Sequence, residues 1–578
     1  MRLKEDGLHN IVPVDVGAEA FVELLNANGV DYIFLSPGSD TIYIQEALSK
    51  FKALGKRAPQ VVLGLHESVS MAAAHGYFMV SGKPQVVLVH VDLGAQQVGG
   101  ALHNAQRGRI GVVLCAGRAA MSFDEDRPSR TRLAYLTEQF DQASVVRGYV
   151  KWDYELRSNE NIHHVVQRAF QVASTEPCGP VYLVLPRELL MEKISSVRIP
   201  DVARYAASAT PQADLTLLDK VADMLIQAEN PLIITDYLGR HREAVASLAE
   251  LAETLGARVT TTMFNMSFPT THPLWGGFMP EPYIKDADVI LIIDHDAPYT
   301  PAQAKFAPGA KIIHIDIDPV KSNMPTRFFP ADILIEADSS KAIPALTGII
   351  REKITPERQR VFQTRFSRLE SQHKRMHEEW SQLAEREAGK KPISQEWLCR
   401  CVAEAIDDKA IVLNEVAGGL YSVARQVPRT EPGTYFTQYG SSLGWGPGAV
   451  VGAKLAAPDR TVVLLVGDGS FIYGCPTAAI WAAVRHNAPN LTIVFNNGEY
   501  RALKGIWPML YRGDSYSEKT GHWVGVDFKP CPDYALIAQA CGAYGQRVEE
   551  PSDVKPALRK ALEIARGGQT AVLDVIIE

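Results

Sequence analysis

The sequence predicts an α/β protein built from three doubly wound domains, each with its own parallel sheet. Two observations predict this class. Short apolar, β-branched runs alternate with helical patterns along three stretches of the chain, which is typical of layered α/β folds. The chain also has 578 residues, too many for a single hydrophobic core. We therefore expect domains at 1–190, 191–350 and 393–578, with a helical linker at 351–392.

The first two stretches carry the alternation clearly. From about 14 to 190 the apolar runs are DYIFLSPGS, QVVLVHVD, IGVVLCAG and GPVYLVLP, and the segment ESVSMAAAHGYFMVSG has a helical pattern. From about 200 to 345 the runs are PLIIT, ARVTTT, DVILIIDHD and AKIIHIDID. Unbroken apolar runs of this length indicate parallel strands that are covered on both faces.

A charged segment separates these stretches from the third. Residues 354–391 have a helical pattern and no strand signal, which predicts a solvated helical connector; an interaction arm is the alternative. The third stretch, 393–578, then resumes the alternation with AIVLNE, TVVLLVGDG, LTIVFNN and TAVLDVII. The first and third domains are expected to resemble each other.

Composition excludes several classes of protein. The net charge is −7, so there is no basic footprint for nucleic acid. The seven cysteines are scattered without a CxxC pair, which indicates neither a zinc cage nor a disulfide framework. The N-terminus lacks an apolar signal region, and no run approaches 18 apolar residues. We expect a cytoplasmic protein without a membrane segment.

Polar residues close two neighbouring strands of the third domain. Asp468 ends the run TVVLLVGDG, and Asn496 and Asn497 end the run LTIVFNN. Parallel α/β sheets bind ligands at the carboxyl edge of their strands. Carboxylate and amide oxygens suit a magnesium ion that also binds a phosphate, and glycine amides at a helix N-terminus would hold that phosphate. A dinucleotide site is the competing interpretation, but no GxGxxG follows a strand, and GYFMVSGKP does not match a P-loop.

These residues resemble a known family. GDG at 467–469 and NN at 496–497, separated by 26 residues, are similar to the thiamin-diphosphate motif of the acetolactate synthase and 2-oxo acid decarboxylase superfamily. The resemblance spans about 14–578. It implies an N-terminal domain that binds the pyrimidine ring of the cofactor, a middle domain, and a C-terminal domain that binds the diphosphate. It also implies thiamin diphosphate and Mg²⁺ as cofactors. Its metal ligands correspond to Asp468, Asn497 and the backbone carbonyl of Glu499.

The resemblance assigns the remaining cofactor contacts as well. The acid that protonates the pyrimidine ring corresponds to Glu67, which follows the run VVLGLH and opens the Ala- and Gly-rich helix; the alternative is an acid that only complements the helix dipole. The segment YGSSLGWGPGAVVGAKLA places Leu443 beneath the bend of the cofactor. The other expected cofactor contacts are Ala417, Gly418, Gly419, Gly440, Ser441, Gly467, Gly469 and Ser470.

Three residues correspond to the substrate side of the family's site. Ser39, in FLSPGSDTIY, is expected to face the substrate, and Gln97 to lie near the cofactor. His90, in VLVHVDLGAQQ, occupies the place of a proton-transferring histidine in benzoylformate decarboxylase, and a group that titrates near neutral pH suits that task. The alternative for His90 is a satisfied core histidine at a strand end.

Other positions depart from the acetolactate synthase pattern. In EQFDQASVVRGYVKWDYEL, Asp141, Arg147 and Lys151 match it, whereas Glu138 and Trp152 do not. Lys151 is expected either to bind a carboxylate or to be a solvated surface lysine.

The middle domain also lacks the glycine-rich turn of flavin-binding synthases. In its place the chain has the segment TDYLGRHR, which starts at Thr235 and continues with Asp236 and Tyr237. Asp236 would put a negative charge where flavin phosphates approach. We therefore expect no tightly held FAD.

The expected function is C–C bond cleavage or formation next to a carbonyl by an acetolactate synthase-like carboligase acting on 2-oxo acids. A 2-oxo acid decarboxylase, or a 2-hydroxyacyl or ketone lyase without ligation, is the first alternative. A cofactor-binding regulatory protein with the same fold is the second. The family's geometry implies a homodimer or homotetramer with the site between subunits, and a small 2-oxo acid or ketone as substrate.

Overall fold

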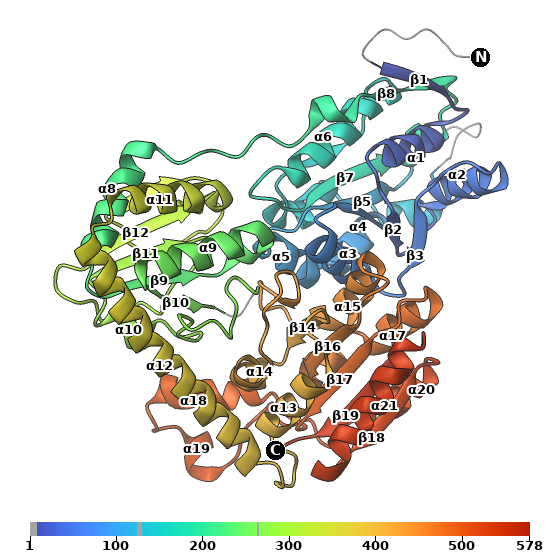
Figure 1. Ribbon diagram of the computed structural model, residues 1–578. Coiled ribbons are helices and arrows are strands. Elements are labelled where there is room, and N and C mark those ends of the chain that lie inside the picture. The colour runs from blue at the N-terminus through green and yellow to red at the C-terminus, as the bar shows by residue number, and fades with distance from the viewer. Residues whose placement is uncertain (1–8, 124–129, 263–264) are drawn as a thin grey trace.

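The computed structural model describes residues 9–123, 130–262 and 265–578, and they form three α/β domains around three parallel sheets (Figure 1). The middle domain lies beside the other two, and the N-terminal and C-terminal domains meet through their helices. Three doubly wound parallel-sheet domains were predicted from the sequence, and this prediction is confirmed.

The N-terminal domain has a six-stranded sheet in the order β3-β2-β4-β5-β7-β6. Its strands are β2 (Tyr32–Leu35), β3 (Gln60–Leu63), β4 (Gln85–Val89), β5 (Val112–Arg118), β6 (Asp153–Glu155) and β7 (Val181–Pro186). Its helices are α1 (Gly17–Ala27), α2 (Ile42–Ala53), α3 (Glu67–Ser81), α4 (Val91–Gln97), α5 (Gly99–Arg107), α6 (Ile162–Ser174) and α7 (Arg187–Met191). A separate antiparallel pair joins β1 (His9–Pro13) to β8 (Ser196–Pro200), across the boundary expected at residue 190.

The middle domain has a five-stranded sheet in the order β10-β9-β11-β12-β13. Its strands are β9 (Pro231–Thr235), β10 (Arg258–Thr261), β11 (Val289–Ile293), β12 (Lys311–Asp316) and β13 (Ile333–Glu336). Its helices are α8 (Leu215–Gln227), α9 (Arg242–Leu255), α10 (Glu281–Ile284) and α11 (Ser339–Lys353).

The C-terminal domain has a six-stranded sheet in the order β15-β14-β16-β17-β19-β18. Its strands are β14 (Ile411–Glu415), β15 (Tyr435–Thr437), β16 (Val462–Gly467), β17 (Leu491–Asn496), β18 (Tyr544–Val548) and β19 (Ala571–Ile576). Its helices are α13 (Gln395–Ala405), α14 (Leu420–Gln426), α15 (Trp445–Ala456), α16 (Asp468–Tyr473), α17 (Pro476–Arg485), α18 (Arg501–Tyr511), α19 (Tyr516–Thr520), α20 (Tyr534–Ala540) and α21 (Val554–Arg566).

The two outer domains share one strand order. In each, the first strand lies between the second and the third, and the last two strands are exchanged. After the second strand, the later strands are added on the other side of the first one. The strand order therefore reverses between β2 and β4 in the N-terminal domain, and between β14 and β16 in the C-terminal domain. Such switch points are where doubly wound sheets bind ligands.

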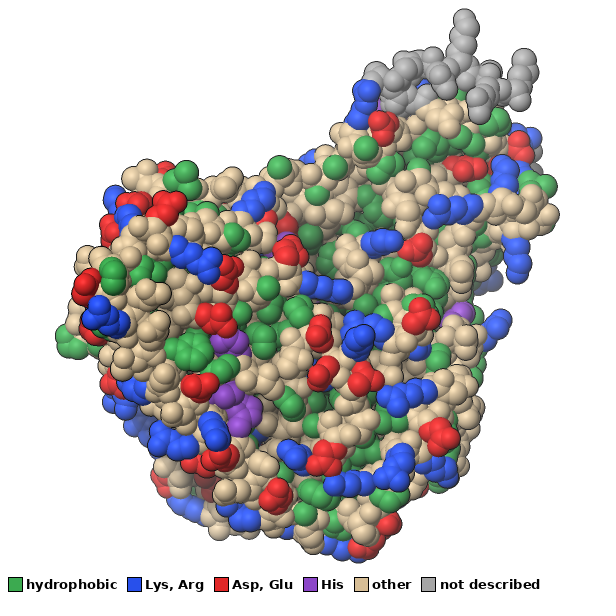
Figure 2. All heavy atoms as spheres, viewed as in Figure 1, with side chains coloured by type: hydrophobic (Ala, Val, Ile, Leu, Met, Phe, Trp, Pro, Cys, Tyr) green, Lys and Arg blue, Asp and Glu red, His purple; other side chains and the backbone are tan. Residues whose placement is uncertain are grey.

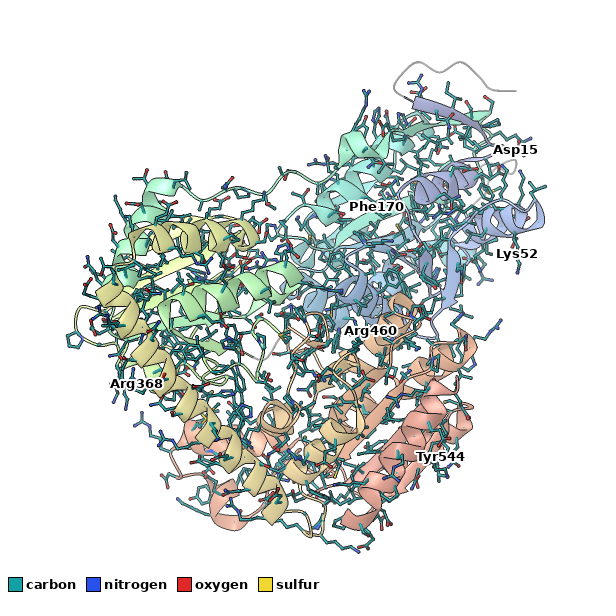
Figure 3. All side chains as sticks on the ribbon, viewed as in Figure 1. Asp15, Lys52, Phe170, Arg368, Arg460 and Tyr544 are labelled. Carbon is teal, nitrogen blue, oxygen red and sulfur yellow. The ribbon has the colours of Figure 1, made fainter. Side chains whose placement is uncertain are left out.

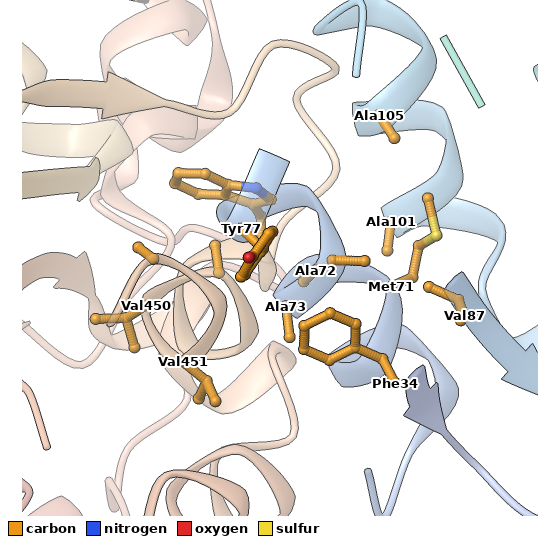
Figure 4. Close-up of a cluster of buried hydrophobic side chains, with 14 of the residues drawn as sticks. Phe34, Met71, Ala72, Ala73, Tyr77, Val87, Ala101, Ala105, Val450 and Val451 are labelled. Carbon is orange, nitrogen blue, oxygen red and sulfur yellow. The ribbon is translucent and has the colours of Figure 1, made fainter. Parts of the chain in front are cut away.

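Helices α3 and α15 join the outer domains (Figure 4). Their backbones pack closely because small residues face each other: a β-carbon on Gly76 would overlap the backbone of Ala449, and one on Gly452 would overlap that of Ala73. Buried side chains from both helices and from the N-terminal sheet, including Phe34, form one continuous core. The interface is therefore a shared core between two domains.

The charged connector is one long helix, α12 (Pro356–Arg386), which runs from the middle domain to the C-terminal domain (Figure 1). The side chain of Thr355 accepts a hydrogen bond from Arg358 N at 3.4 Å and caps its first turn. The helix is only partly solvated, because Phe362 and Leu369 are buried against the middle domain. Arg368, labelled in Figure 3, lies on the same helix.

Phe170 of α6, also labelled in Figure 3, is buried in the core of the N-terminal domain.

The surface carries mixed charge. On the face shown in Figure 2, Lys and Arg side chains alternate with Asp and Glu, and no large area has a single sign. Among the residues that the structure describes, none of the helices combines the length and the apolar character that crossing a bilayer requires.

Candidate active site

A cavity of about 610 Å³ opens at the switch point of the C-terminal sheet. Because Gly467 of β16 is in register with Phe495 of β17, the residues that follow both strands reach the same edge of the sheet. The cavity wall contains every cofactor and metal residue predicted for this domain except Gly440: Ala417, Gly418, Gly419, Ser441, Leu443, Gly467, Asp468, Gly469, Ser470, Asn497 and Glu499.

Asp468 provides a buried carboxylate at this edge. Its side chain is 2 % exposed. Its Oδ1 accepts a hydrogen bond from Gly469 N at 2.8 Å, and its Oδ2 accepts from Asn497 N at 2.9 Å and Gly498 N at 2.6 Å. The first turn of α16 and the loop after β17 are thus tied to one carboxylate.

The other two predicted metal ligands lie on that loop. Asn497 Oδ1 accepts a hydrogen bond from Glu499 N at 3.0 Å, and the carbonyl of Glu499 accepts one from Arg501 N at 2.9 Å. The side chain of Glu499 pairs with Lys504. Each oxygen retains a second lone pair.

The donor set fits a hard divalent cation. Burial raises the pKa of Asp468 to about 6, against the lowering effect of its three backbone hydrogen bonds. The strongest influences on its charge are burial, backbone amides and another acid, Asp574, so a cation would supply the balance that a buried carboxylate needs. One carboxylate, one amide oxygen and one carbonyl leave positions open for phosphate and water, as magnesium prefers. The described residues contain no cluster of three His, Cys, Asp or Glu side chains that could hold a metal. A cation at Asp468 would therefore also depend on amide and carbonyl oxygens.

Glu415 is a buried acid at this edge that the sequence did not single out. It ends β14, in register with Val466 of β16. Its Oε1 accepts a hydrogen bond from Gly444 N at 2.7 Å, and its Oε2 accepts one from Gly446 N at 2.7 Å. Burial raises the pKa of Glu415 to about 7. Glu415 therefore anchors the turn after Leu443. Its position at the end of the apolar run AIVLNE is the sequence signal that could have identified it.

The N-terminal domain carries a second group of polar residues at its own switch point. Glu67 is the first residue of α3, and His90 directly precedes α4. Glu67 lies close to α4, since a β-carbon on Gly94 of that helix would stand 3.4 Å from Glu67 Oε1, and the charge of Glu67 acts on the His90 ring. His90 Nδ1 is bonded to the buried carboxylate of Asp40, which the sequence had not identified. Ser39 and Gln97 are exposed on the same domain.

One chain does not bring the two groups together. Glu67, His90, Ser39 and Gln97 are absent from the wall of the C-terminal cavity, as far as the described residues define it. The start of α3 does approach the C-terminal domain, since Val69 packs on Ala478 and Ala479 of α17. The structure therefore places the two groups of predicted site residues on separate domains.

The residues that match the synthase pattern make local structural contacts. Lys151 Nζ donates to the backbone carbonyls of Val172, Thr175 and Pro177 at 2.9, 2.6 and 2.7 Å. All three of its donors are thereby used, so Lys151 holds a turn together.

Arg147 serves a similar local purpose. It forms ion pairs with Asp141 at 2.6 Å and Asp153 at 3.0 Å.

The turn after β9 is filled by side chains. Tyr237 is 4 % exposed, stacks on Tyr439 with 4.4 Å between ring centroids, and donates to Arg107 O at 2.8 Å. The guanidinium of Arg109 lies 4.3 Å above the Tyr237 ring. The segment after β9, which has no glycine-rich turn, is therefore packed between the middle domain and the two outer domains.

Comparison with known proteins identifies the family. Models of the thiamine pyrophosphate enzymes match in order: the N-terminal TPP-binding domain at residues 15–145, the central domain at 218–346, and the C-terminal TPP-binding domain at 417–575. The chain belongs to the family of thiamine pyrophosphate (thiamin diphosphate) enzymes. The resemblance stated from the sequence is confirmed.

Individual relatives cover almost the whole chain. Benzoylformate decarboxylase of Pseudomonas aeruginosa is 26% identical over 95% of this chain and 96% of its own length. The acetolactate synthase isozyme 3 large subunit of Escherichia coli is 24% identical, with 97% and 95% covered. A solved 4-hydroxybenzoylformate decarboxylase of Rhodococcus jostii has the same fold, with a TM-score of 0.78 at 23% identity over 97% of this chain and 99% of that chain. The relatives include carboligases and decarboxylases, so they assign the enzyme family and leave the specific activity open.

Proposed function

We propose that this protein is a thiamin diphosphate- and Mg²⁺-dependent enzyme that forms or cleaves C–C bonds next to the carbonyl of a 2-oxo acid, as an acetolactate synthase-like carboligase. The observation that carries the proposal is the buried Asp468 carboxylate facing the cavity together with Asn497 and Glu499. When bound, the cofactor supplies a nucleophilic carbon and an electron sink for this chemistry.

The residues of the chain divide the remaining tasks. Asp468, Asn497 and the carbonyl of Glu499 hold the metal, and the amides that open α16 hold the diphosphate. Leu443, next to the turn that Glu415 anchors, would support the cofactor from the cavity wall. Glu67 holds a proton at the pyrimidine ring, Gln97 lies near the cofactor, and Ser39 and His90 face the substrate.

The site is completed by a second copy of the chain. Its two halves lie on different domains, and exposed apolar side chains lie near both: Leu65 and Leu93 near Glu67 are 56% and 43% exposed, and Tyr473 at the cavity is 63% exposed. A two-fold pair of chains would bury these side chains and bring each Glu67 to the partner's cavity. We propose a homodimer or a homotetramer made of such dimers.

Complementation between inactive variants tests this assembly. Glu67→Gln and Asp468→Ala are each expected to be inactive alone. Mixed after dissociation and reassociation, they should regain activity, because one of the two sites in each mixed dimer then has both residues. If the mixture stays inactive although mass spectrometry shows mixed dimers, the intersubunit site is wrong.

Decarboxylation without ligation is the second candidate, and His90 at a switch point favours it, because a proton donor there would release an aldehyde. Product analysis decides between the two: a panel of 2-oxo acids, with and without aldehyde acceptors, should give hydroxyketones in the first case and only aldehydes in the second. A regulatory protein without activity would turn over no member of the panel. We also propose that the enzyme is cytoplasmic and holds no FAD; flavin absorbance in the purified protein would contradict the latter.

A further inference from the structure

Asp40 lies beneath His90 in the N-terminal half-site, in the loop between β2 and α2. Its side chain is 0 % exposed. Oδ1 is bonded to His90 Nδ1, and Oδ2 accepts a hydrogen bond from Val91 N at 3.0 Å. One carboxylate therefore holds both the ring of His90 and the backbone that follows it.

The surrounding backbone is shaped to this pair. A β-carbon on Gly38 would overlap the His90 ring, and one on Gly117 of β5 would overlap the Asp40 carboxylate. Val91 has a φ of 30°, a conformation that a β-branched residue rarely adopts. Such backbone strain persists only where the surroundings impose it, and the bond from Val91 N to Asp40 is one of the contacts that do so.

The other ring nitrogen remains available. The His90 side chain is 26% exposed, and within the described residues Nε2 has no hydrogen bond. The charged groups that act most strongly on the ring are all acids: Asp40 from the loop before α2, Asp92 from α4, and Glu67 from α3. The hydrogen bond with Asp40 is the largest influence, and it raises the pKa of His90 above its ordinary value, against the opposing effect of burial.

We propose that Asp40 is the positioning residue of His90: its carboxylate keeps hydrogen on Nδ1 and turns Nε2 toward the substrate side of the half-site. The inference deepens the proposed function and rests on it for the identity of the substrate. In the protonated ring, Nε2–H donates to the carboxylate or carbonyl oxygen of a bound 2-oxo acid, while Nδ1–H stays with Asp40. Asp40 itself touches no substrate.

Histidine NMR tests the pair without relying on activity. The full-length protein labelled with ¹³C at histidine Cε1 is titrated, and the His90 signal is assigned with His90→Gln. In Asp40→Asn the midpoint of the His90 signal should fall by about 1 to 3 pH units, since the adjacent charge is lost. Asp92→Asn is the matched control: it removes a nearby acid that does not bond the ring, and its shift should be smaller. Equal midpoints in wild type and Asp40→Asn would overturn the proposal.

Kinetics test the positioning role. Asp40→Asn should lower kcat about 10²-fold at pH 8 with little change in KM, which is the range for loss of one acid–base group. The deficit should shrink at lower pH, where the solvent protonates His90 directly. A folded Asp40→Asn variant with an unchanged pH profile would refute the role.

A second variant covers the case in which Asp40→Asn does not fold. Gly117→Ala keeps the charge of Asp40 but displaces its carboxylate, and it should lower the His90 midpoint and kcat in the same direction. If the wild type shows no thiamin diphosphate-dependent turnover, the proposed function fails, while the NMR titration still decides whether Asp40 controls His90.

Discussion

Gly452 of α15 faces the carbonyl oxygen of Ala73 on α3 so closely that a β-carbon there would overlap it. The N-terminal and C-terminal domains are held at this contact, and it sets the distance between the two helices. Because the contacting atom belongs to the backbone, no rotamer change can relieve an added methyl group.

Gly452→Ala should therefore destabilise the protein by about 1 to 3 kcal/mol, the usual cost of overpacking a core. The measurement is thermal unfolding followed by fluorescence. Gly348→Ala is the control, since Gly348 lies in helix α11 with open space where its β-carbon would stand. Gly348→Ala should slightly raise the free energy of unfolding, because alanine has a higher helix propensity than glycine. Equal melting temperatures for Gly452→Ala and wild type would contradict the close packing.

Glu415 should make stability depend on pH. Its folded pKa, about 7, lies above the value of 4.5 for an unperturbed glutamate, so between these values the folded state binds a proton that the unfolded state has released. Stability should fall as pH rises from about 4.5 to 7 and level off above that, by at most about 3 kcal/mol for this group. Glu415→Gln removes that contribution, so the difference between variant and wild type should vary over this window. A constant difference would show that Glu415 is ionised throughout.

Asp468→Ala should weaken Mg²⁺-dependent binding of thiamin diphosphate by about 10²-fold or more, because it removes the one carboxylate in the proposed metal site. Isothermal titration calorimetry with and without Mg²⁺ measures this. Glu499→Gln is the matched control, because only the backbone carbonyl of Glu499 is proposed as a ligand, and its binding should stay near wild type. A Glu499→Gln variant as weak as Asp468→Ala would place the side chain of Glu499 on the metal instead.

Glu67→Gln should retain cofactor binding and lose about 10²- to 10⁴-fold in kcat, the range for removal of a proton-transferring group. Steady-state turnover and calorimetry on the same sample separate the two properties. Glu46→Gln, a change at an exposed acid on α2, should leave both unchanged. Turnover near wild type in Glu67→Gln would remove the residue from the mechanism.

The fold followed from the sequence because parallel strands buried on both faces leave unbroken apolar runs, such as the one before Asp468. Asp468 and Asn497 of the C-terminal cavity could be singled out because each directly follows a strand, and the resemblance to the family supplied the other predicted residues of its wall. Asp40 and Glu415 were missed for a physical reason. Each acts on a segment distant in the chain, His90 fifty residues later in one case and the Gly444 turn in the other, and only the strand order makes them neighbours.

The helix α12 has a mechanical consequence. Its 31 residues span about 46 Å at 1.5 Å per residue. Near one end Arg365 donates to Gly256 O at 2.9 Å in the middle domain, and toward the other the carbonyl of Trp380 accepts from Gln426 Nε2 at 2.8 Å in the C-terminal domain. The helix thus acts as a rigid connector that transmits displacement of one domain to the other, so the C-terminal domain cannot swing freely relative to the middle domain.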